Sequence, residues 1–222
     1  MDGSRCNFTS FQHDGYASPP GHRGFGPFAD GQQEQGVTIL RQPEQRIISG
    51  YHHDYHSYDV DSLGKPSLDT YARAVAGCSV RMLVRGSEPN STDGGLAACG
   101  HSPPPSVEET SRAKDILSQM QFVGLTEKWD LTVCLWHARF GPPSCDPSEF
   151  VDTRPGEMAA ENTWYGTKPF EQTGFRDEHD GALYKHAENL FWGALHRLNL
   201  TRDQCDDWKR SCIAWSSVHG VG

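Results

Sequence analysis

Residues 41–49 combine side chains that could hold a phosphate group. They follow an apolar run, residues 37–40, that is typical of a buried strand, and Pro43 ends the strand because proline lacks a backbone donor. Arg41 is therefore expected at the carboxyl end of a strand, where open α/β sheets bind ligands. Its guanidinium group can donate two hydrogen bonds to a phosphate, and the hydroxyl group of Ser49 a third. Taken alone, the pair could equally be a surface arginine and a serine near the start of a helix.

The histidines that follow suggest a different chemistry. His52 and His56 would lie on one face of a continued helix, and a pair at this spacing can bind zinc. The zinc-protease motif also requires a glutamate after the first histidine, but the sequence has His53 there. A metal-dependent hydrolase is therefore the least favoured alternative, and we assign no metal site.

Composition limits the possible partners and the size of the fold. A net charge of −9 argues against a nucleic-acid partner recognised through overall charge. No apolar run approaches the roughly 20 residues of a membrane helix, so no transmembrane segment is expected, and the start of the chain does not resemble a signal peptide. The 222 residues can form one domain with a real core, and 23 glycines and 14 prolines predict long loops.

The seven cysteines include no Cys-x-x-Cys pair, which argues against a zinc ribbon or a thioredoxin-like site. They are either reduced thiols or a few disulfides with one thiol left over. Cys205 and Cys212 would lie two turns apart on one helix, too far for a mutual bond. Asn-x-Thr sequons at Asn7, Asn90 and Asn199 favour a secretory compartment slightly.

Helical and strand patterns alternate along the rest of the chain. Residues 106–109 form a capping box before an amphipathic helix, and residues 121–125 are typical of a short buried strand. Thr126 is expected to cap the next helix, which runs to Phe140. This order predicts an α/β fold in which helices flank a parallel sheet and long loops connect the elements.

Further helices are expected at residues 68–83, at residues 176–198 and after a second capping box formed by Thr201 and Gln204. The helix at residues 176–198 would be the longest, with Leu198 closing its apolar stripe. The expected organisation is an irregular amino-terminal segment (1–36), a main domain (37–200), and a short helix with a tail (201–222).

Four segments match one protein family in order. The pattern Arg-x-Pro-x-x-Arg-x-x-Ser at residues 41–49 resembles the 3′-phosphate-binding segment of sulfotransferases that use 3′-phosphoadenosine 5′-phosphosulfate. Residues 80–83, 122–127 and 179–191 resemble later segments of the same family, and Phe-Val-Gly-Leu-Thr-Glu at 122–127 is the most recognisable. Together they resemble Golgi carbohydrate sulfotransferases, most of all the heparan sulfate 6-O-sulfotransferases, over roughly residues 8–198.

This resemblance implies a P-loop-like fold that moves a sulfuryl group to a sugar hydroxyl of a polysaccharide, in the lumen or at the membrane of the Golgi. His13 corresponds to the catalytic base, since an imidazole can take the hydroxyl proton near neutral pH. His53 corresponds to a residue that contacts the acceptor sugar.

The resemblance also implies a set of cofactor contacts. Arg41 and Ser49 correspond to ligands of the 3′-phosphate, while Thr163 and Lys168 correspond loosely to a second nucleotide-binding loop. Arg46 is expected to have a structural role, pairing with an acid or a carbonyl group.

The sequence departs from the family in one respect. The family's loop of Lys, Gly and Ser/Thr, which holds the 5′-phosphosulfate, does not occur before Arg41, and its amino-terminal anchor is also missing. We therefore expect either an incomplete sequence or a protein that has lost the half of its site that activates the donor. Weak or absent sulfuryl transfer is expected, because the main electrostatic stabilisation would be missing. The alternative is a non-catalytic remnant that binds a nucleotide or a glycan.

Overall fold

A computed structural model of the chain describes residues 36–52, 66–85, 103–141, 146–151 and 168–219. This part is mostly helical and contains a small sheet of two parallel strands, β1 (Val37–Leu40) and β2 (Phe122–Leu125). Val37 lies beside Phe122, and Leu40 beside Leu125. Both strands lie where the sequence predicts them, and the arrangement is compatible with the expected α/β class. Strand β2 is buried as expected, but β1 is not: it is largely half-buried and Ile39 is 45% exposed, because in the described residues β2 is the one strand that pairs with it.

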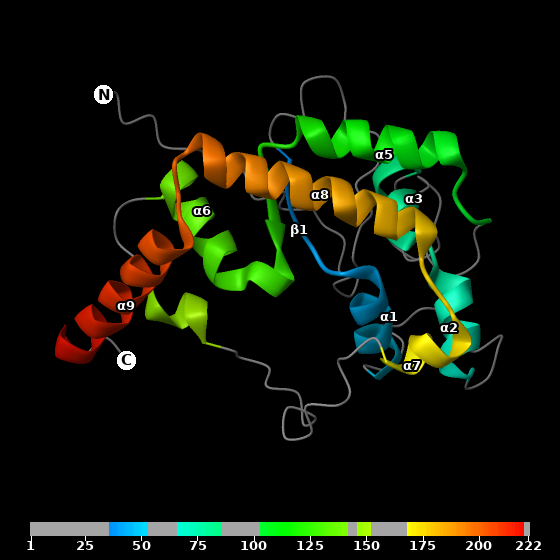
Figure 1. Cartoon of the computed structure of the whole chain (residues 1–222), viewed down its shortest axis with the longest axis horizontal. Coiled ribbons are helices and arrows are strands. Elements are labelled where there is room, and N and C mark those ends of the chain that lie inside the picture. Colours follow the sequence, from blue (N-terminus) through cyan, green and yellow to red (C-terminus); the bar gives the residue numbers. More distant parts are fainter. Residues whose placement is uncertain (1–35, 53–65, 86–102, 142–145, 152–167, 220–222) are drawn as a thin grey trace, which may run out of the picture.

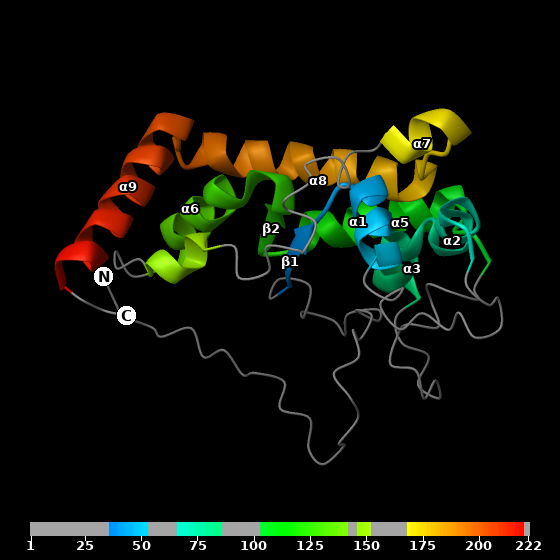
Figure 2. The ribbon, with the colours of Figure 1, turned by 90° about the horizontal axis from the view of Figure 1, so that it is seen from below.

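The helices are arranged around one long element, as Figures 1 and 2 show. Helix α8 runs along the described part, with α6 and α9 near its carboxyl end and α2 and α7 near its amino end. In chain order the helices are α1 (Pro43–His52), α2 (Leu68–Val75), α3 (Cys78–Val84), α5 (Val107–Gln119), α6 (Trp129–Phe140), α7 (Lys168–Thr173), α8 (Glu178–Arg197) and α9 (Arg202–His219), with short 3-10 turns at η3 (Thr126–Lys128) and η4 (Pro147–Phe150).

Buried apolar side chains form two clusters. The larger one joins α3, α5, β2, α6 and α8, and α8 contributes Leu183, Ala187, Phe191 and Leu195. Leu198, expected in this stripe, is instead 44% exposed, because α8 ends at Arg197 and the chain turns there. The smaller cluster joins α1, α2 and the segment around α7 through Ile47, Ile48, Tyr71, Ala72, Val75, Phe170 and Phe175.

Two glycines lie where a side chain would not fit. The helix expected at residues 68–83 is broken into α2 and α3 by Gly77, which has a φ of 72° that favours glycine. A Cβ atom there would also lie 2.5 Å from the ring of Pro105. In β2, a Cβ atom on Gly124 would lie 2.5 Å from Thr132 Cγ2, so the glycine lets α6 pack closely against the strand.

The predicted helix starts are partly confirmed. Both capping boxes form: Glu109 N–H donates to Ser106 Oγ at 3.1 Å, and Gln204 N–H donates to Thr201 Oγ1 at 3.2 Å. The expectation that Thr126 caps α6 is wrong, because its hydroxyl group donates to the carbonyl oxygen of Leu40 in β1 instead. Helix α9 is not short, since it extends to His219.

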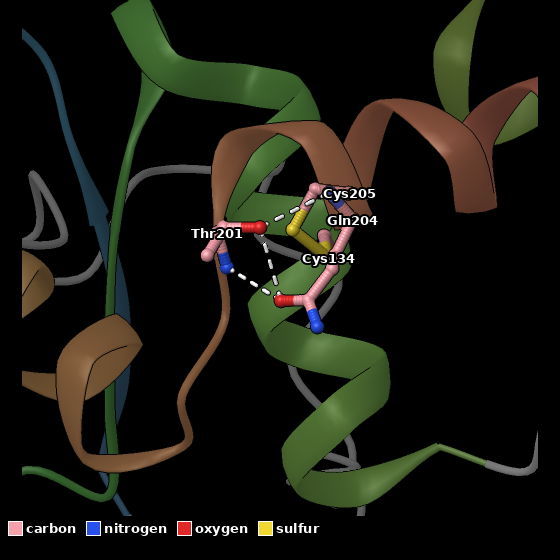
Figure 3. The surroundings of a disulfide bond; sticks show 4 residues. All are labelled: Cys134, Thr201, Gln204 and Cys205. Carbon is pink, nitrogen blue, oxygen red and sulfur yellow. Dashed lines mark hydrogen bonds between the residues drawn. A yellow bond between two sulfur atoms is a disulfide. The ribbon is translucent and has the colours of Figure 1, made fainter.

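A disulfide between Cys134 and Cys205 joins α6 to α9, with the two Cα atoms 5.6 Å apart (Figure 3). Cys78 and Cys212 each take part in a disulfide as well. The disulfide alternative is therefore the one the protein adopts, and the prediction that Cys205 and Cys212 do not bond to each other is confirmed. Within the described residues, no helix is both long and apolar enough to cross a membrane.

Candidate functional site

Arg41 lies at the carboxyl end of β1, immediately before α1. The residues on both sides of it are bonded to η3, the turn that directly follows β2. Thr126 Oγ1 donates to the carbonyl oxygen of Leu40 at 2.9 Å, and Gln42 N–H donates to Glu127 Oε1 at 2.8 Å. These two bonds hold the backbone of Arg41 at the sheet edge where α/β proteins bind ligands.

Glu127 connects this edge to α8. While one carboxylate oxygen accepts from Gln42, the other accepts from the hydroxyl group of Tyr184 at 2.8 Å. Burial and the bond to Glu127 raise the pKa of Tyr184 above its ordinary value, so the phenol stays a proton donor. The residue before α1, the turn after β2 and the middle of α8 therefore meet at one half-buried carboxylate.

Ser49 lies in α1 and is only 8% exposed. The helix begins at Pro43, a favourable first position because the missing N–H is one that would have no partner within the helix. Gln42 Oε1 accepts from Gln45 N–H at 2.7 Å and so satisfies one of the first donors. Ile47 and Ile48 bury the helix against α2. The segment from Arg41 to Ser49 is thus a strand end followed by an anchored helix, as predicted.

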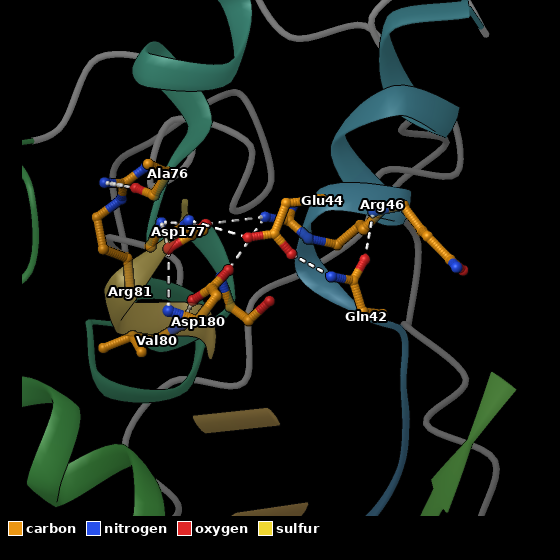
Figure 4. Close-up of polar contacts among 11 residues, drawn as sticks. Gln42, Glu44, Arg46, Ala76, Val80, Arg81, Asp177 and Asp180 are labelled. Atoms are coloured by element: carbon orange, nitrogen blue, oxygen red, sulfur yellow. Dashed lines mark hydrogen bonds and ion pairs between the residues drawn. The ribbon is translucent and has the colours of Figure 1, made fainter. Parts of the chain in front are cut away.

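Two buried carboxylates, Asp177 and Asp180, fix α1 against α8 (Figure 4). Arg46 Nη2 lies 3.0 Å from Asp180 Oδ2, so the expected structural role of Arg46 is confirmed. Asp180 also accepts from the backbone N–H groups of Ser79 and Val80 at the start of α3, both at 2.9 Å. One carboxylate therefore links α1, α3 and α8.

Asp177 makes a second link at the same place. It is the N-cap of α8, accepting from Asp180 N–H at 3.0 Å, and its other oxygen accepts from Gly77 N–H at 2.9 Å. Its own N–H donates to Glu44 Oε1 at 3.1 Å, which adds a contact to α1. Asp177 is 2% exposed. Burial first, and the neighbouring Asp180 second, raise its pKa to about 6.

This raised pKa predicts how stability depends on pH. Asp177 binds its proton more tightly in the folded protein than in the unfolded chain, where its pKa is about 3.9. The contribution of Asp177 to stability is therefore fully present below about pH 4, and it is lost as the pH rises to about 6. For the wild type, we expect the free energy of unfolding to fall by roughly 3 kcal/mol over this interval because of Asp177. In Asp177→Asn this fall should be absent.

Urea unfolding of both proteins at several pH values from 4 to 7 would measure this difference. Asp146→Asn is a matched control, because Asp146 is an exposed cap of η4 whose pKa is lowered by its bond to Ser148. Parallel curves for the wild type and Asp177→Asn would contradict the prediction.

The other residues predicted for the site are placed only in part. His13, His53 and Thr163 lie outside the described residues, and Lys168 begins α7. His52 ends α1, and the described ranges contain no group of three or more potential metal ligands. The structure thus shows Arg41 and Ser49 on one strand–helix unit and leaves the remaining assignments as predictions.

Two parts of the site were not predicted from the sequence. No role in the site was assigned to Glu127 or Tyr184, although both lie in segments that resemble the family. A groove at the opposite edge of the sheet, beside the start of β2, is flanked by Arg139 and Arg197. It is separate from the carboxyl edge that holds Arg41.

Comparisons of the chain with family models, curated proteins and solved structures gave no match.

Proposed function

We propose that this protein is a sulfotransferase and that residues 41–49 form the 3′-phosphate side of its site for 3′-phosphoadenosine 5′-phosphosulfate. The observation that carries the proposal is the meeting of three segments at Glu127. The phosphate segment, the Phe-Val-Gly-Leu-Thr-Glu segment and the late helix each resemble the same family, and Gln42, Glu127 and Tyr184 bond them together. Segments that resembled the family only by chance would not be expected to meet at one hydrogen-bonded residue.

The chemistry of the edge supports a phosphate ligand. A guanidinium group matches two phosphate oxygens at once, and such charge-assisted bonds are stronger than neutral ones. The hydrogen bonds on either side of Arg41 fix the backbone from which this side chain extends. In a chain with a net charge of −9, a cation held at a sheet edge supplies the local attraction that the whole molecule lacks. Ser49, on the same unit, would supply the third donor.

The proposed reaction is transfer of a sulfuryl group to a sugar hydroxyl of a polysaccharide. The hydroxyl oxygen attacks the sulfur atom, the bond between sulfur and the 5′-phosphate oxygen breaks, and 3′-phosphoadenosine 5′-phosphate leaves. His13 would take the hydroxyl proton, His53 would contact the acceptor sugar, and Thr163 and Lys168 would contact the nucleotide. A P-loop-like sulfotransferase fold, with its sheet edge at Arg41, is part of the same proposal.

The disulfides support the proposed location. Disulfides persist in oxidising compartments and are rare in the cytosol. The Cys134–Cys205 bond, together with the bonded Cys78 and Cys212, therefore favours a secretory compartment. We propose the lumen of the Golgi as the compartment, because the family that the chain resembles acts on polysaccharides there.

Arg41→Ala is expected to weaken binding of 3′-phosphoadenosine 5′-phosphate by about tenfold to a hundredfold, because a hydrogen bond to a charged group contributes about 1.5–3 kcal/mol. Isothermal titration calorimetry would measure the change. Arg73→Ala is the matched control: Arg73 is an exposed arginine of α2 that pairs with Asp69. The nucleotide proposal fails if the folded wild type does not bind, or if Arg41→Ala binds as tightly as Arg73→Ala.

A nucleotide-binding protein without transferase activity is the second candidate. It is favoured by the sequence, which contains no Gly-x-x-x-x-Gly-Lys-Ser/Thr pattern to hold the 5′-phosphosulfate. Transfer of radiolabelled sulfate to a polysaccharide separates the candidates, because nucleotide binding without turnover indicates the second one. Tightly bound zinc in a protein that does not bind the nucleotide would instead indicate a histidine-dependent metal hydrolase.

A further inference from the structure

The turn between α8 and α9 contains a sequon, Asn199-Leu200-Thr201, in a position suited to modification. Asn199 is exposed and has a φ of 52°, in the left-handed region that asparagine adopts more readily than most residues. Its backbone N–H donates to the carbonyl oxygen of His196 at 3.0 Å, which closes the end of α8. Its backbone is therefore bound into the turn while its side chain lies at the surface.

The surroundings of Asn199 leave room for a bulky group. Figures 1 and 2 place the α8–α9 turn at the outer end of the described part. Leu200 packs against the main core and anchors the turn, whereas Leu198 on the other side is 44% exposed. A carbohydrate on Asn199 would extend outward without displacing core residues, and it would lie next to the exposed apolar side chain of Leu198.

The same turn leads directly into a disulfide. Cys205, in the first turns of α9, bonds to Cys134 of α6 (Figure 3). The compartment in which such bonds form is also the one in which asparagines of Asn-x-Ser/Thr sequons receive glycans. Asn199 and Cys205 thus require the same environment, and this does not depend on whether the protein binds a nucleotide.

We propose that Asn199 is a site of N-linked glycosylation. The donor is an oligosaccharide linked to a lipid through a diphosphate, and the cell's transferase catalyses the step. A bond forms between the amide nitrogen of Asn199 and C1 of the first sugar. The bond between C1 and the phosphate oxygen breaks, the lipid diphosphate leaves, and the amide nitrogen loses one proton.

The role of Thr201 sets the order of events. The sequon needs the threonine hydroxyl group, but in the folded protein this group donates to Gln204 Oε1 at 3.0 Å and accepts from Gln204 N–H. Modification therefore precedes the closing of this capping box at the start of α9. Once α9 has formed, Asn199 would keep its glycan but would no longer gain one.

The test is peptide mapping of the disulfide-bonded protein after expression through the secretory pathway of eukaryotic cells. Mapping only the protein secreted into the medium ensures that every molecule mapped has passed through that compartment. Peptide N-glycosidase should convert Asn199 to aspartate, which marks the former glycan. Asparagine at this position in the bulk of the disulfide-bonded protein would overturn the proposal, whatever happens at Asn7 and Asn90.

Variants separate the sequon from the fold. Thr201→Ala should abolish the modification, whereas Thr201→Ser should retain it, because serine serves both as a sequon residue and as a helix cap. Asn199→Gln should also abolish it while leaving the cap intact. Modification at Asn199 that persists in Thr201→Ala would overturn the proposal. Nucleotide binding, measured on the same samples, reports on the proposed function separately.

Discussion

Replacing Asp180 with alanine is expected to lower the free energy of unfolding by about 3 kcal/mol, because this buried carboxylate is the acceptor for three donors, one of them the half-buried guanidinium group of Arg46. Asp180 is 1% exposed and bonds to Arg46 at 3.0 Å. The backbone N–H groups of Ser79 and Val80 would also lose their side-chain acceptor at the start of α3. Urea unfolding at pH 7 would measure the loss.

The control is Asp69→Ala. Asp69 also bonds to an arginine, Arg73, but the pair is exposed and lies within one helix, so little change in stability is expected. Asp180→Asn should lie between the two, since it keeps one acceptor oxygen but loses the charge. If Asp180→Ala unfolds at the same urea concentration as Asp69→Ala, Asp180 does not stabilise the packing of α1 against α8.

The same substitution should affect the candidate site. Arg46 lies on α1 between the two predicted phosphate ligands, so its bond to Asp180 determines where the helix sits relative to α8. Under the proposed function, Asp180→Ala should weaken nucleotide binding even where the protein is still folded. Normal binding by a folded Asp180→Ala protein would show that the site does not depend on this anchor.

The double variant Cys134→Ser/Cys205→Ser should lose about 4 kcal/mol of stability, because its disulfide closes a long loop and restricts the unfolded chain. The two cysteines are 71 positions apart, and the bond fastens α9 to α6. Helix α9 should therefore separate from the rest of the protein at a lower urea concentration. Tryptophan fluorescence would detect this, since Trp208 of α9 contacts His137 of α6, with the ring centroids 4.9 Å apart.

The double variant is a sharper test than a reducing agent, because Cys78 and Cys212 are disulfide-bonded as well and would also be reduced. The single variant Cys134→Ser is the comparison for a free Cys205 thiol. An unfolding midpoint equal to that of the wild type would show that packing alone holds α9 in place.

The sequence by itself determined the features that depend on neighbouring residues. Residues 37–40 and 122–125 form strands because each is a short apolar run, and Ser106 begins α5 because its partner Glu109 lies within one turn. The position of Arg41 at the end of a strand follows in the same way, since Pro43 is incompatible with a continuing strand. Such interactions span a few residues, so a local pattern is enough to reveal them.

Contacts between distant residues were decided only by the tertiary structure. Thr126 has the residue type of a helix cap, yet it donates to Leu40, because the parallel register brings the two strand ends together. Gly77 interrupts the helical pattern expected at residues 68–83, where its N–H donates to Asp177 at the start of α8. In both cases, a partner far along the chain competes with the local preference and prevails.

The candidate site is divided in the same manner. The two residues expected to bind phosphate, Arg41 and Ser49, lie in one continuous segment, whereas the hydrogen bonds that hold this segment in place were not predicted. Glu127 accepts from Gln42 and from Tyr184, and Asp180 joins three helices, but no spacing in the sequence relates these residues. The partner of Cys205 was equally indeterminate, since several cysteines were eligible and only folding brings Cys134 within bonding distance. A carboxylate or a thiol can bond to whatever group approaches it, so the choice of partner depends on which elements pack together.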